Sequence, residues 1–289
     1  MRFQVMDMLC FELNHNDVLN MLPDRKACSH KGDFGKILLL CGSRGYTGAA
    51  ALACMGALRA GAGLVYLGVP ESIYTIEATK LTEPVIFPLP DRGGMMAKEA
   101  IGEIKKRLPN MDAILIGPGM GCSDDTFLIV KEILSAFAGP VVLDADGINV
   151  LAGHIDILRG RTGQTILTPH EGEFKRIGGK PELGRLESAK RFAESANAIV
   201  LLKGHNTVIT DGVTTYVNPT GNPGMAVGGS GDVLAGIITA LLGYKLPPLE
   251  AAACGAWLHG AAGDICAAEI GQYGMLPTDM VQVLPRLLK

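Results

Sequence analysis

A glycine segment followed by a single aspartate is the strongest chemical signal in the sequence. The letters "GGSG" occupy residues 228–231, and Asp232 follows directly. Apolar residues then recur with the spacing of one helical face. We therefore expect the segment to lie on the N-terminal side of a helix, where unpaired backbone N–H groups can bind phosphate. The candidate phosphate-binding residues are Gly228, Gly229, Ser230 and Gly231.

Asp232 allows two interpretations. An ionised carboxylate beside a phosphate is repelled unless it has a chemical task. Accepting the proton of a hydroxyl that attacks the phosphate is such a task, and it indicates phosphoryl transfer. The alternative is that Asp232 caps the helix while the glycines form a turn.

Further polar residues follow apolar strand patterns. Asp144 and Asp146 come after "PVVL", and His170 comes after "QTILTP". Open α/β sheets bind ligands at the carboxyl ends of their strands. The two aspartates could organise Mg²⁺, or Asp146 could cap the next helix. His170 could contact a ligand or bond a loop carbonyl.

The segment "TPHEGEF" adds two glutamates to this edge. Glu171 and Glu173 could bind Mg²⁺ through water, or Glu173 could open the next helix. No His/Cys cluster has zinc spacing, and no Gly-x-Ser-x-Gly elbow occurs in a strand–turn–helix setting. We therefore assign no metal-ligating residue.

Lys203 ends another apolar run, "AIVLL", and Gly204 after it permits a tight turn. On local sequence alone, Lys203 could be an ordinary exposed lysine before a hairpin. His205 is typical of a polar loop residue rather than a catalyst.

Two further glycine turns belong to the same edge. "GSRGYTGAA" leads into a helix near Ala49, and "GPGMG" places Gly119 and Gly121 after a strand. Their spacing matches neither the dinucleotide fingerprint nor the Walker loop. Close approach of a ligand to the backbone is possible at Ala49, Gly119 and Gly121, and the alternative for the two glycines is a plain turn.

Alternating strand and helix patterns must position these residues. Buried strands are expected at 36–42, 64–70, 112–116, 140–144, 164–168 and 198–204. Helices are expected at 47–63, capped by Thr47, at 126–137, at 187–197 and after Asp232. Residues 1–30 suggest a helix and a connecting loop, and Asp211-Gly212 predicts a β-hairpin over 207–218. The sequence thus predicts one α/β domain over 1–289, with a mainly parallel central sheet and helices on both faces.

Composition limits the possible partners and compartment. The chain has 289 residues, 48% hydrophobic and 19% charged, which supports a large core. A net charge of -3 gives no argument for nucleic acid or an anionic membrane. Seven cysteines without a CxxC pair favour a reducing compartment. With no secretory signal and no transmembrane pattern, we expect a cytoplasmic protein.

Six motifs together resemble the ADP-dependent NAD(P)H-hydrate dehydratase family of the ribokinase-like superfamily. They are "HKGDFGKILLLCGSRGYTGAAALA", "ILIGPGMG", "VVLDADGIN", "ILTPHEGEF", "LLKGHNTVI" and "NPTGNPGMAVGGSGDVLAG". They occur in the family's order from about His30 to the C-terminus. Ser230 stands where the family usually has Thr, a change that keeps the hydroxyl group.

The resemblance implies a three-layer ribokinase-like fold and a repair enzyme. Such an enzyme dehydrates the (S)-epimer of hydrated NADH or NADPH, with ADP (or ATP) as co-substrate and Mg²⁺ as cofactor. It implies Asp232 as the catalytic residue, and substrate contacts at Ala49, Gly119, His170 and Asp232. It implies nucleotide contacts at Lys203, Gly204, His205, Asn206, Thr207 and residues 228–231.

The resemblance also implies a partner. Many bacterial members carry an epimerase domain, which this length does not accommodate, so we expect a separate NAD(P)H-hydrate epimerase. The Ala-rich C-terminal region suggests a homo-oligomer, or it is core. Two other functions stay open, a small-molecule kinase for a hydroxymethylpyrimidine, hydroxyethylthiazole or sugar, and a nucleotide-binding regulator without catalysis.

Overall fold

The computed structural model describes residues 9–288, so the ends of the domain predicted over 1–289 lie outside the described residues. The main sheet has ten strands in the order β1-β12-β11-β10-β9-β8-β7-β2-β3-β4. Their bounds are β1 Leu9–Glu12, β2 Lys36–Leu40, β3 Leu64–Pro70, β4 Val85–Leu89, β7 Ala113–Ile116, β8 Val141–Leu143, β9 Thr165–Leu167, β10 Ile199–Leu202, β11 Thr207–Thr210 and β12 Thr214–Asn218. A separate small hairpin joins β5 Asp91–Arg92 to β6 Met95–Met96.

Within the described sheet, β11 alone runs against the direction of its neighbours. The strand patterns of the sequence are confirmed, as is the hairpin of β11 and β12. The chain runs outward from β2 to β4 and then returns to β7, which pairs with β2 on its other side. This reversal makes the carboxyl ends of β2 and β7 a topological switch point, where open α/β sheets bind ligands.

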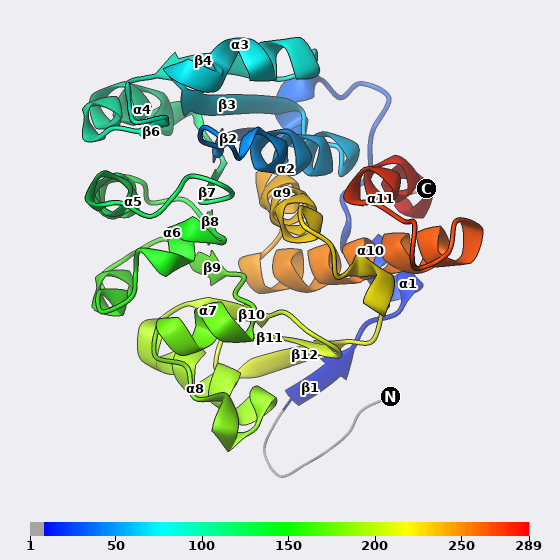
Figure 1. The fold of residues 1–289 in the computed structure, drawn as a ribbon. Helices are drawn as coiled ribbons and strands as arrows, with labels where there is room; N and C mark the ends of the chain where they lie inside the picture. Colours follow the sequence, from blue (N-terminus) through cyan, green and yellow to red (C-terminus); the bar gives the residue numbers. More distant parts are fainter. Residues whose placement is uncertain (1–8, 289) are drawn as a thin grey trace.

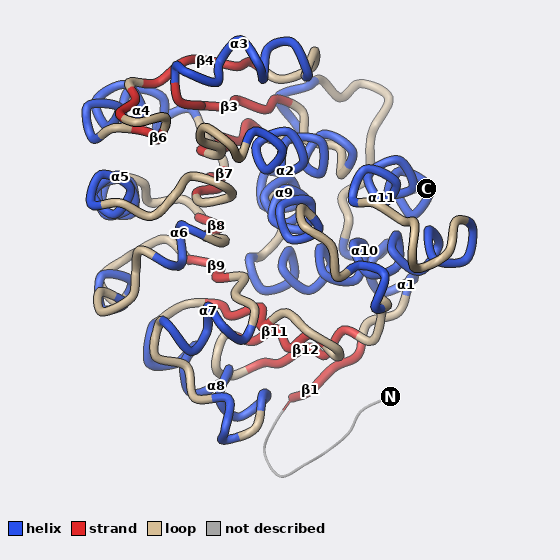
Figure 2. The backbone as a smooth tube through the Cα atoms, viewed as in Figure 1, coloured by secondary structure: helices blue, strands red, loops and turns tan. Residues whose placement is uncertain are grey.

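Helices cover both faces of the sheet, as predicted (Figure 1). Their bounds are α1 His15–Met21, α2 Thr47–Arg59, α3 Glu71–Lys80, α4 Ile101–Arg107, α5 Asp124–Ala136, α6 Asp146–Asn149, α7 Glu171–Arg176, α8 Arg185–Ala196, α9 Ser230–Gly243, α10 Pro248–Glu269 and α11 Pro277–Val283. Figure 2 shows the strands between the two helical layers. Alternate residues of β2 serve the two cores: Ile37 and Leu39 face α2, α9 and α10, whereas Leu38 and Leu40 face α4 and α5.

Two glycines let α2 and α9 approach each other at backbone distance. A Cβ on Gly56 would lie 2.5 Å from the carbonyl oxygen of Val233, and one on Gly236 would lie 2.0 Å from that of Ala53. Both helices begin at the edge of the sheet where the parallel strands end. Their close packing therefore fixes the first turn of α9 relative to the switch point.

Three local predictions need correction. The helix after the glycine segment begins at Ser230 rather than Asp232, because Gly229 takes the N-cap position with φ +96°. Thr47 is the first residue of α2 and not its cap, since Tyr46 holds that position without a side-chain hydrogen bond. The sequence reading also missed β1, which pairs with β12.

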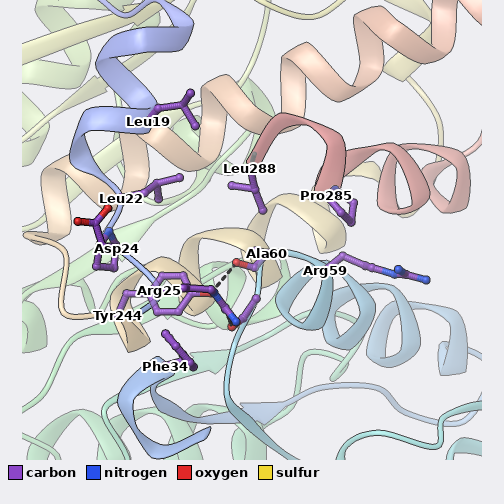
Figure 3. A pocket seen from close by; sticks show the side chains of 12 residues that line it. Leu19, Leu22, Asp24, Arg25, Phe34, Arg59, Ala60, Tyr244, Pro285 and Leu288 are labelled. Carbon is purple, nitrogen blue, oxygen red and sulfur yellow. Dashed lines mark hydrogen bonds between the residues drawn. The ribbon is translucent and has the colours of Figure 1, made fainter. Parts of the chain in front are cut away.

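A cavity of about 500 Å³ lies near the ends of α2 and α9, away from their first turns (Figure 3). There the Arg25 guanidinium donates to the carbonyl of Gly61 and to the hydroxyl of Tyr244. None of the site residues predicted from the sequence lines this cavity. No helix in the described part of the chain is long and apolar enough to cross a membrane.

Candidate active site

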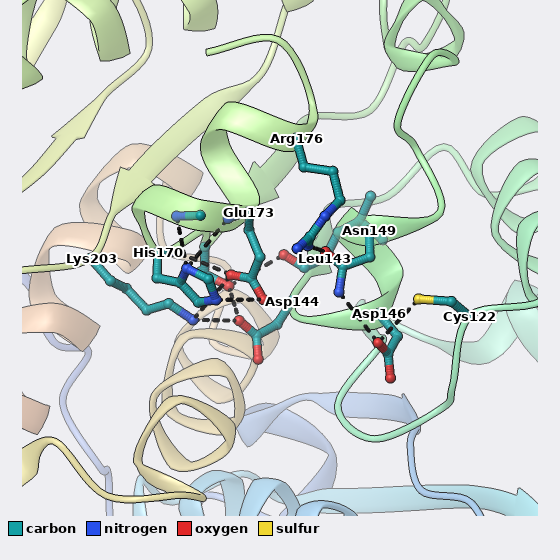
Figure 4. Close-up of polar contacts among 11 residues, drawn as sticks. Cys122, Leu143, Asp144, Asp146, Asn149, His170, Glu173, Arg176 and Lys203 are labelled. Carbon is teal, nitrogen blue, oxygen red and sulfur yellow. Dashed lines mark hydrogen bonds and ion pairs between the residues drawn. The ribbon is translucent and has the colours of Figure 1, made fainter. Parts of the chain in front are cut away.

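Three adjacent strands deliver polar side chains to one edge of the sheet (Figure 4). Asp144 follows β8, Thr168 and His170 follow β9, and Lys203 follows β10. Because these strands are parallel neighbours, their carboxyl ends meet at the same edge. The sequence reading is confirmed in this respect.

Lys203 lies between two buried carboxylates. Its ammonium donates to Asp144 Oδ1 at 3.0 Å and lies 3.9 Å from Glu173 Oε2. The Thr168 hydroxyl also donates to Asp144 Oδ1, at 2.6 Å. Burial alone would lower the pKa of Lys203, but the charges of Asp144 and Glu173 outweigh it and raise that pKa above its ordinary value. Lys203 is therefore a fixed cation.

His170 caps α7. Its Nδ1 accepts hydrogen bonds from the backbone N–H groups of Gly172 and Glu173, at 3.0 and 3.3 Å. The Glu173 carboxylate accepts from the N–H of His170 at 2.9 Å, which completes a reciprocal capping box. Glu173 thus lies in the first turn of the helix, as one alternative predicted. The predicted hydrogen bond from His170 to a loop carbonyl is not formed; the ring instead accepts hydrogen bonds from two backbone amides. Nε2 of His170 lies 3.5 Å from Glu173 Oε1, and the side chain is 59% exposed, so the outer face of the ring can be reached from solvent.

Asp232 lies in the first turn of α9, at the same edge. The α9 N-terminus has no side-chain cap, so the interpretation of Asp232 as a cap is wrong. Burial raises the pKa of Asp232 to about 7, with a further rise from the charge of Asp144, whereas Lys203 opposes it. A carboxyl group with a pKa near neutrality is suited to accept and release a proton.

The glycine segment has the backbone that its sequence predicted. A Cβ on Gly229 would meet the Leu52 side chain at 2.3 Å, and φ there is +96°, so glycine is required. Gly228 is exposed and Gly229 is half-buried. The Ser230 N–H donates to the carbonyl of Val227 at 3.3 Å. The N–H groups of the first turn of α9 have no partner within the helix, and they carry the positive end of its dipole.

Lys203 connects the two segments that were predicted to bind the nucleotide, residues 203–207 and residues 228–231. Its Nζ lies 3.3 Å from the position of a Cβ on Gly231. After Lys203 the chain turns through the exposed residues 204–206, and the Thr207 hydroxyl donates to the carbonyl of Gly204 at 2.9 Å. The structure shows this arrangement, and nucleotide contacts at Gly204, His205, Asn206 and Thr207 stay predictions.

Ala49 and Gly119 meet at the switch point. A Cβ on Gly119 would lie 2.8 Å from Cβ of Ala49, and φ at Gly119 is +63°. The Ser43 hydroxyl donates to the carbonyl of Gly119 at 2.7 Å and ties the two loops together. These two predicted substrate residues are thus neighbours, although 70 positions separate them.

Asp146 does not cap its helix as one alternative expected. It is the first residue of α6, and its carboxylate accepts from the Gly121 N–H at 2.8 Å and from Asn149 at 3.3 Å. Glu171 is paired with Arg185 at 2.6 Å. Among residues 9–288, no group of three His, Cys, Asp or Glu side chains could hold a metal ion.

Sequence reasoning missed His259 of α10. Its Nε2 lies 3.3 Å from the Ser230 hydroxyl, and both residues are buried. Burial lowers the pKa of His259 to about 4, so the imidazole is neutral at pH 7. Its only sequence signal is a lone imidazole within the Ala- and Gly-rich stretch "AWLHGAAGD".

Comparison with known proteins agrees with this geometry. A family model described as NAD(P)H-hydrate dehydratase matches residues 37–286. The bifunctional NAD(P)H-hydrate repair enzyme of Moorella thermoacetica is 46% identical over 277 residues, covering 93% of this chain and 52% of its own length. That of Escherichia coli is 36% identical over 272 residues, covering 92% and 50%. The chain thus spans about half the length of the curated relatives it matches.

Solved structures extend the comparison over the whole fold. The ADP/ATP-dependent NAD(P)H-hydrate dehydratase from Bacillus subtilis, co-crystallized with ATP/Mg²⁺, has a TM-score of 0.83 at 32% identity, covering 98% of each chain. A ribokinase-like superfamily protein from Enterococcus faecalis has a TM-score of 0.86 at 26% identity, covering 100% of this chain and 98% of its own. The motif order, the site and these matches agree, and the chain belongs to the NAD(P)H-hydrate dehydratase family within the ribokinase-like superfamily.

Proposed function

We propose that this chain dehydrates the (S)-epimer of hydrated NADH or NADPH back to the reduced cofactor, with ADP converted to AMP and phosphate. The observation that carries the proposal is the position of Asp232, a carboxyl with a pKa of about 7 in the first turn of α9. It lies directly after the glycine segment, and the Lys203 ammonium, next to Gly231, acts on its pKa. Family membership supplies the reaction class.

The proposed chemistry begins with phosphoryl transfer. The terminal phosphate binds the amides around residues 228–231, with Lys203 as a nearby positive charge. Asp232 accepts the proton of the ring hydroxyl, whose oxygen attacks the phosphorus as the bond to AMP breaks. The product is a phosphorylated hydrate and AMP.

Elimination then completes the reaction. The ring nitrogen lone pair expels phosphate, and loss of a proton from the neighbouring ring carbon restores the dihydronicotinamide. Phosphate is a far better leaving group than hydroxide, which explains why a dehydratase is built on a kinase-like fold. Ala49, Gly119 and His170 are proposed to contact the hydrated dinucleotide.

Mg²⁺ belongs to the proposal through the nucleotide. The Bacillus subtilis relative was co-crystallized with ATP/Mg²⁺. Mg²⁺ keeps several waters and is usually bound by one or two carboxylates together with substrate phosphates. In the described residues Asp144 already accepts from Lys203 and Thr168, which fits an ion carried mainly by phosphate oxygens. Bound there, Mg²⁺ would neutralise charge on the transferred group.

Three further expectations remain proposals. The relatives named bifunctional are about twice as long, which supports cooperation with a NAD(P)H-hydrate epimerase. The homo-oligomer stays a prediction without support from the Ala-rich C-terminal region, because that region is core: the α10 residues Ala251, Ala252, Ala253, Ala256 and Ala262 are buried within the described chain. A cytoplasmic location is proposed because all seven cysteines are free, with Cys41, Cys54, Cys254 and Cys266 buried.

The test is recovery of dihydronicotinamide absorbance from hydrated NADH and hydrated NADPH, with Mg²⁺ and either ADP or ATP. Recovery that requires a nucleotide, and that Asp232→Asn abolishes, is the expected result. AMP and phosphate should form in equal amounts when ADP is the donor. No recovery with either nucleotide would contradict the proposal, and a stable phosphorylated product would identify a small-molecule kinase instead.

A further inference from the structure

One face of α10 contacts the segment that leads into the glycine segment. Residues Gly260, Gly263 and Asp264 are spaced so that they share this face. A Cβ on Gly260 would lie 2.2 Å from the Thr220 hydroxyl oxygen, and one on Gly263 would lie 2.3 Å from Sδ of Met225. At Gly260 a Cβ would also lie 2.7 Å from the backbone carbonyl of Thr220, so glycine is required there, whereas at Gly263 it leaves room for the Met225 side chain.

Hydrogen bonds fix the start of the same segment to α10. Asn218 donates to the carbonyl of Ala256, and Thr220 donates to the carbonyl of Trp257, each at 3.1 Å. The register of the segment on the helix is therefore set before the chain reaches residue 221.

Asp264 holds the next two residues. Its carboxylate accepts from the N–H of Gly221 at 2.9 Å and from the side-chain amide of Asn222 at 3.0 Å. Asn222 in turn accepts from the N–H of Gly224 at 3.0 Å. Asp264 is exposed, so these hydrogen bonds contribute little to the free energy of unfolding.

We propose that Asp264 is a positioning residue for nucleotide binding, because it holds the segment 221–225 in the conformation that presents the amides of residues 228–231 to phosphate. His259, also on α10, contacts the Ser230 hydroxyl and so ties the glycine segment itself to the same helix. The inference rests on the proposed role of the glycine segment and names a residue that acts on it without touching the ligand.

The test measures ADP affinity directly, by titration calorimetry with Mg²⁺, so that turnover is not needed. Asp264→Ala removes both acceptors and is expected to raise the ADP Kd about tenfold or more, the effect of losing hydrogen bonds to a charged group. The melting temperature should change little because the side chain is exposed. Glu269→Gln is the matched control, since it alters an exposed carboxylate of α10 that pairs with Arg286.

A reciprocal exchange separates positioning from loss of a side chain. Asn222→Asp alone sets two carboxylates against each other, and Asp264→Asn alone loses the charge that both donors face. In Asp264→Asn with Asn222→Asp, an amide and a carboxylate again face each other, and both backbone N–H groups keep an oxygen acceptor. We expect each single variant to weaken ADP binding and the double variant to return to within about threefold of wild type.

Three outcomes would overturn the inference, and only the third also contradicts the proposed function. Wild-type protein that binds ADP, together with an Asp264→Ala variant of equal affinity, would contradict the positioning role alone. A double variant as weak as the sum of its single changes would do the same. Wild-type protein that binds neither ADP nor ATP would contradict the proposed function as well.

Discussion

The ammonium nitrogen of Lys203 lies 3.3 Å from the point that a Cβ on Gly231 would occupy, so the end of β10 and the first turn of α9 meet at this atom. Asp144 holds the ammonium there through a 3.0 Å contact from the end of β8. A fixed cation is thereby placed beside the N-terminal amides of a helix. Two separate sources of positive potential, a side chain and a helix dipole, converge where an anion would bind.

Replacing Lys203 by Met should weaken nucleotide binding and stability together. Loss of the cation is expected to lower kcat/KM for the nucleotide about a hundredfold or more, as for a removed transition-state contact. Unfolding free energy should fall by about 2–4 kcal/mol, because Asp144 and Glu173 are left buried without their partner. Steady-state kinetics and urea denaturation measure the two effects.

A second variant separates these consequences. Lys203→Met with Asp144→Asn removes the cation and one buried charge, so it should regain stability without regaining activity. Lys131→Met, at an exposed position of α5, serves as the control. An unchanged ADP Kd in Lys203→Met would contradict the assigned role.

The rate of dehydration should depend on the ionisation of Asp232. The carboxylate form is the base, and with a pKa of about 7 it prevails above that pH and is protonated below it. We expect kcat/KM for the hydrated dinucleotide to fall about tenfold per pH unit below 7 and to level off above it. Asp232→Asn should lose about 10²–10⁴-fold in kcat while keeping its ADP affinity. A wild-type profile that is flat between pH 5.5 and 8.5 would contradict this assignment.

The same carboxyl should destabilise the fold at high pH. Its pKa rises from 3.8 to about 7 on folding, so the folded protein favours the protonated form. The contribution of this carboxyl to the unfolding free energy is therefore fully present below pH 3.8, and it is lost as the pH rises toward 7. Since each pKa unit corresponds to about 1.4 kcal/mol, Asp232→Asn should raise the unfolding free energy by about 2–4 kcal/mol at pH 8 and by almost nothing near pH 4. Equal effects at both pH values, by urea denaturation, would contradict the assignment.

The sequence predicted the features that depend on local pattern. Apolar runs ending in polar residues located Asp144, His170 and Lys203, and parallel pairing then brought them to one edge. It could not predict β1, whose partner β12 lies about two hundred positions away and whose pairing is decided by tertiary contact. The role of His259 was hidden for the same reason, because its partner Ser230 belongs to another helix.

The first residue of a helix was also difficult to predict from the sequence. "GGSG" is typical of a turn, and only the positive φ of Gly229 moves the start of α9 to Ser230. At His170 the spacing to Glu173 is that of a capping box. Histidine is not among the common N-cap residues, so a ligand or loop contact was the more natural interpretation.

The contact between Gly119 and Ala49 gives a test of the substrate side of the site. In Gly119→Ala the new methyl group would lie 2.8 Å from Cβ of Ala49 and 2.9 Å from Cβ of Tyr46, so the two switch-point loops must separate. If the hydrated dinucleotide binds there, its KM should rise about tenfold, the scale of an overpacked contact, with the ADP Kd unchanged. Steady-state kinetics and calorimetry distinguish the two ligands.

Gly93 supplies a control with the same backbone. Its φ is +64°, against +63° at Gly119, but a Cβ there would meet nothing within 4 Å. Both alanine variants should lose about 1–2 kcal/mol of stability from the left-handed conformation. Only Gly119→Ala should also lose affinity for the dinucleotide, because only there does the methyl group enter the switch point. If the two variants raise the KM equally, the effect comes from backbone strain, and the substrate contact at Gly119 must be abandoned.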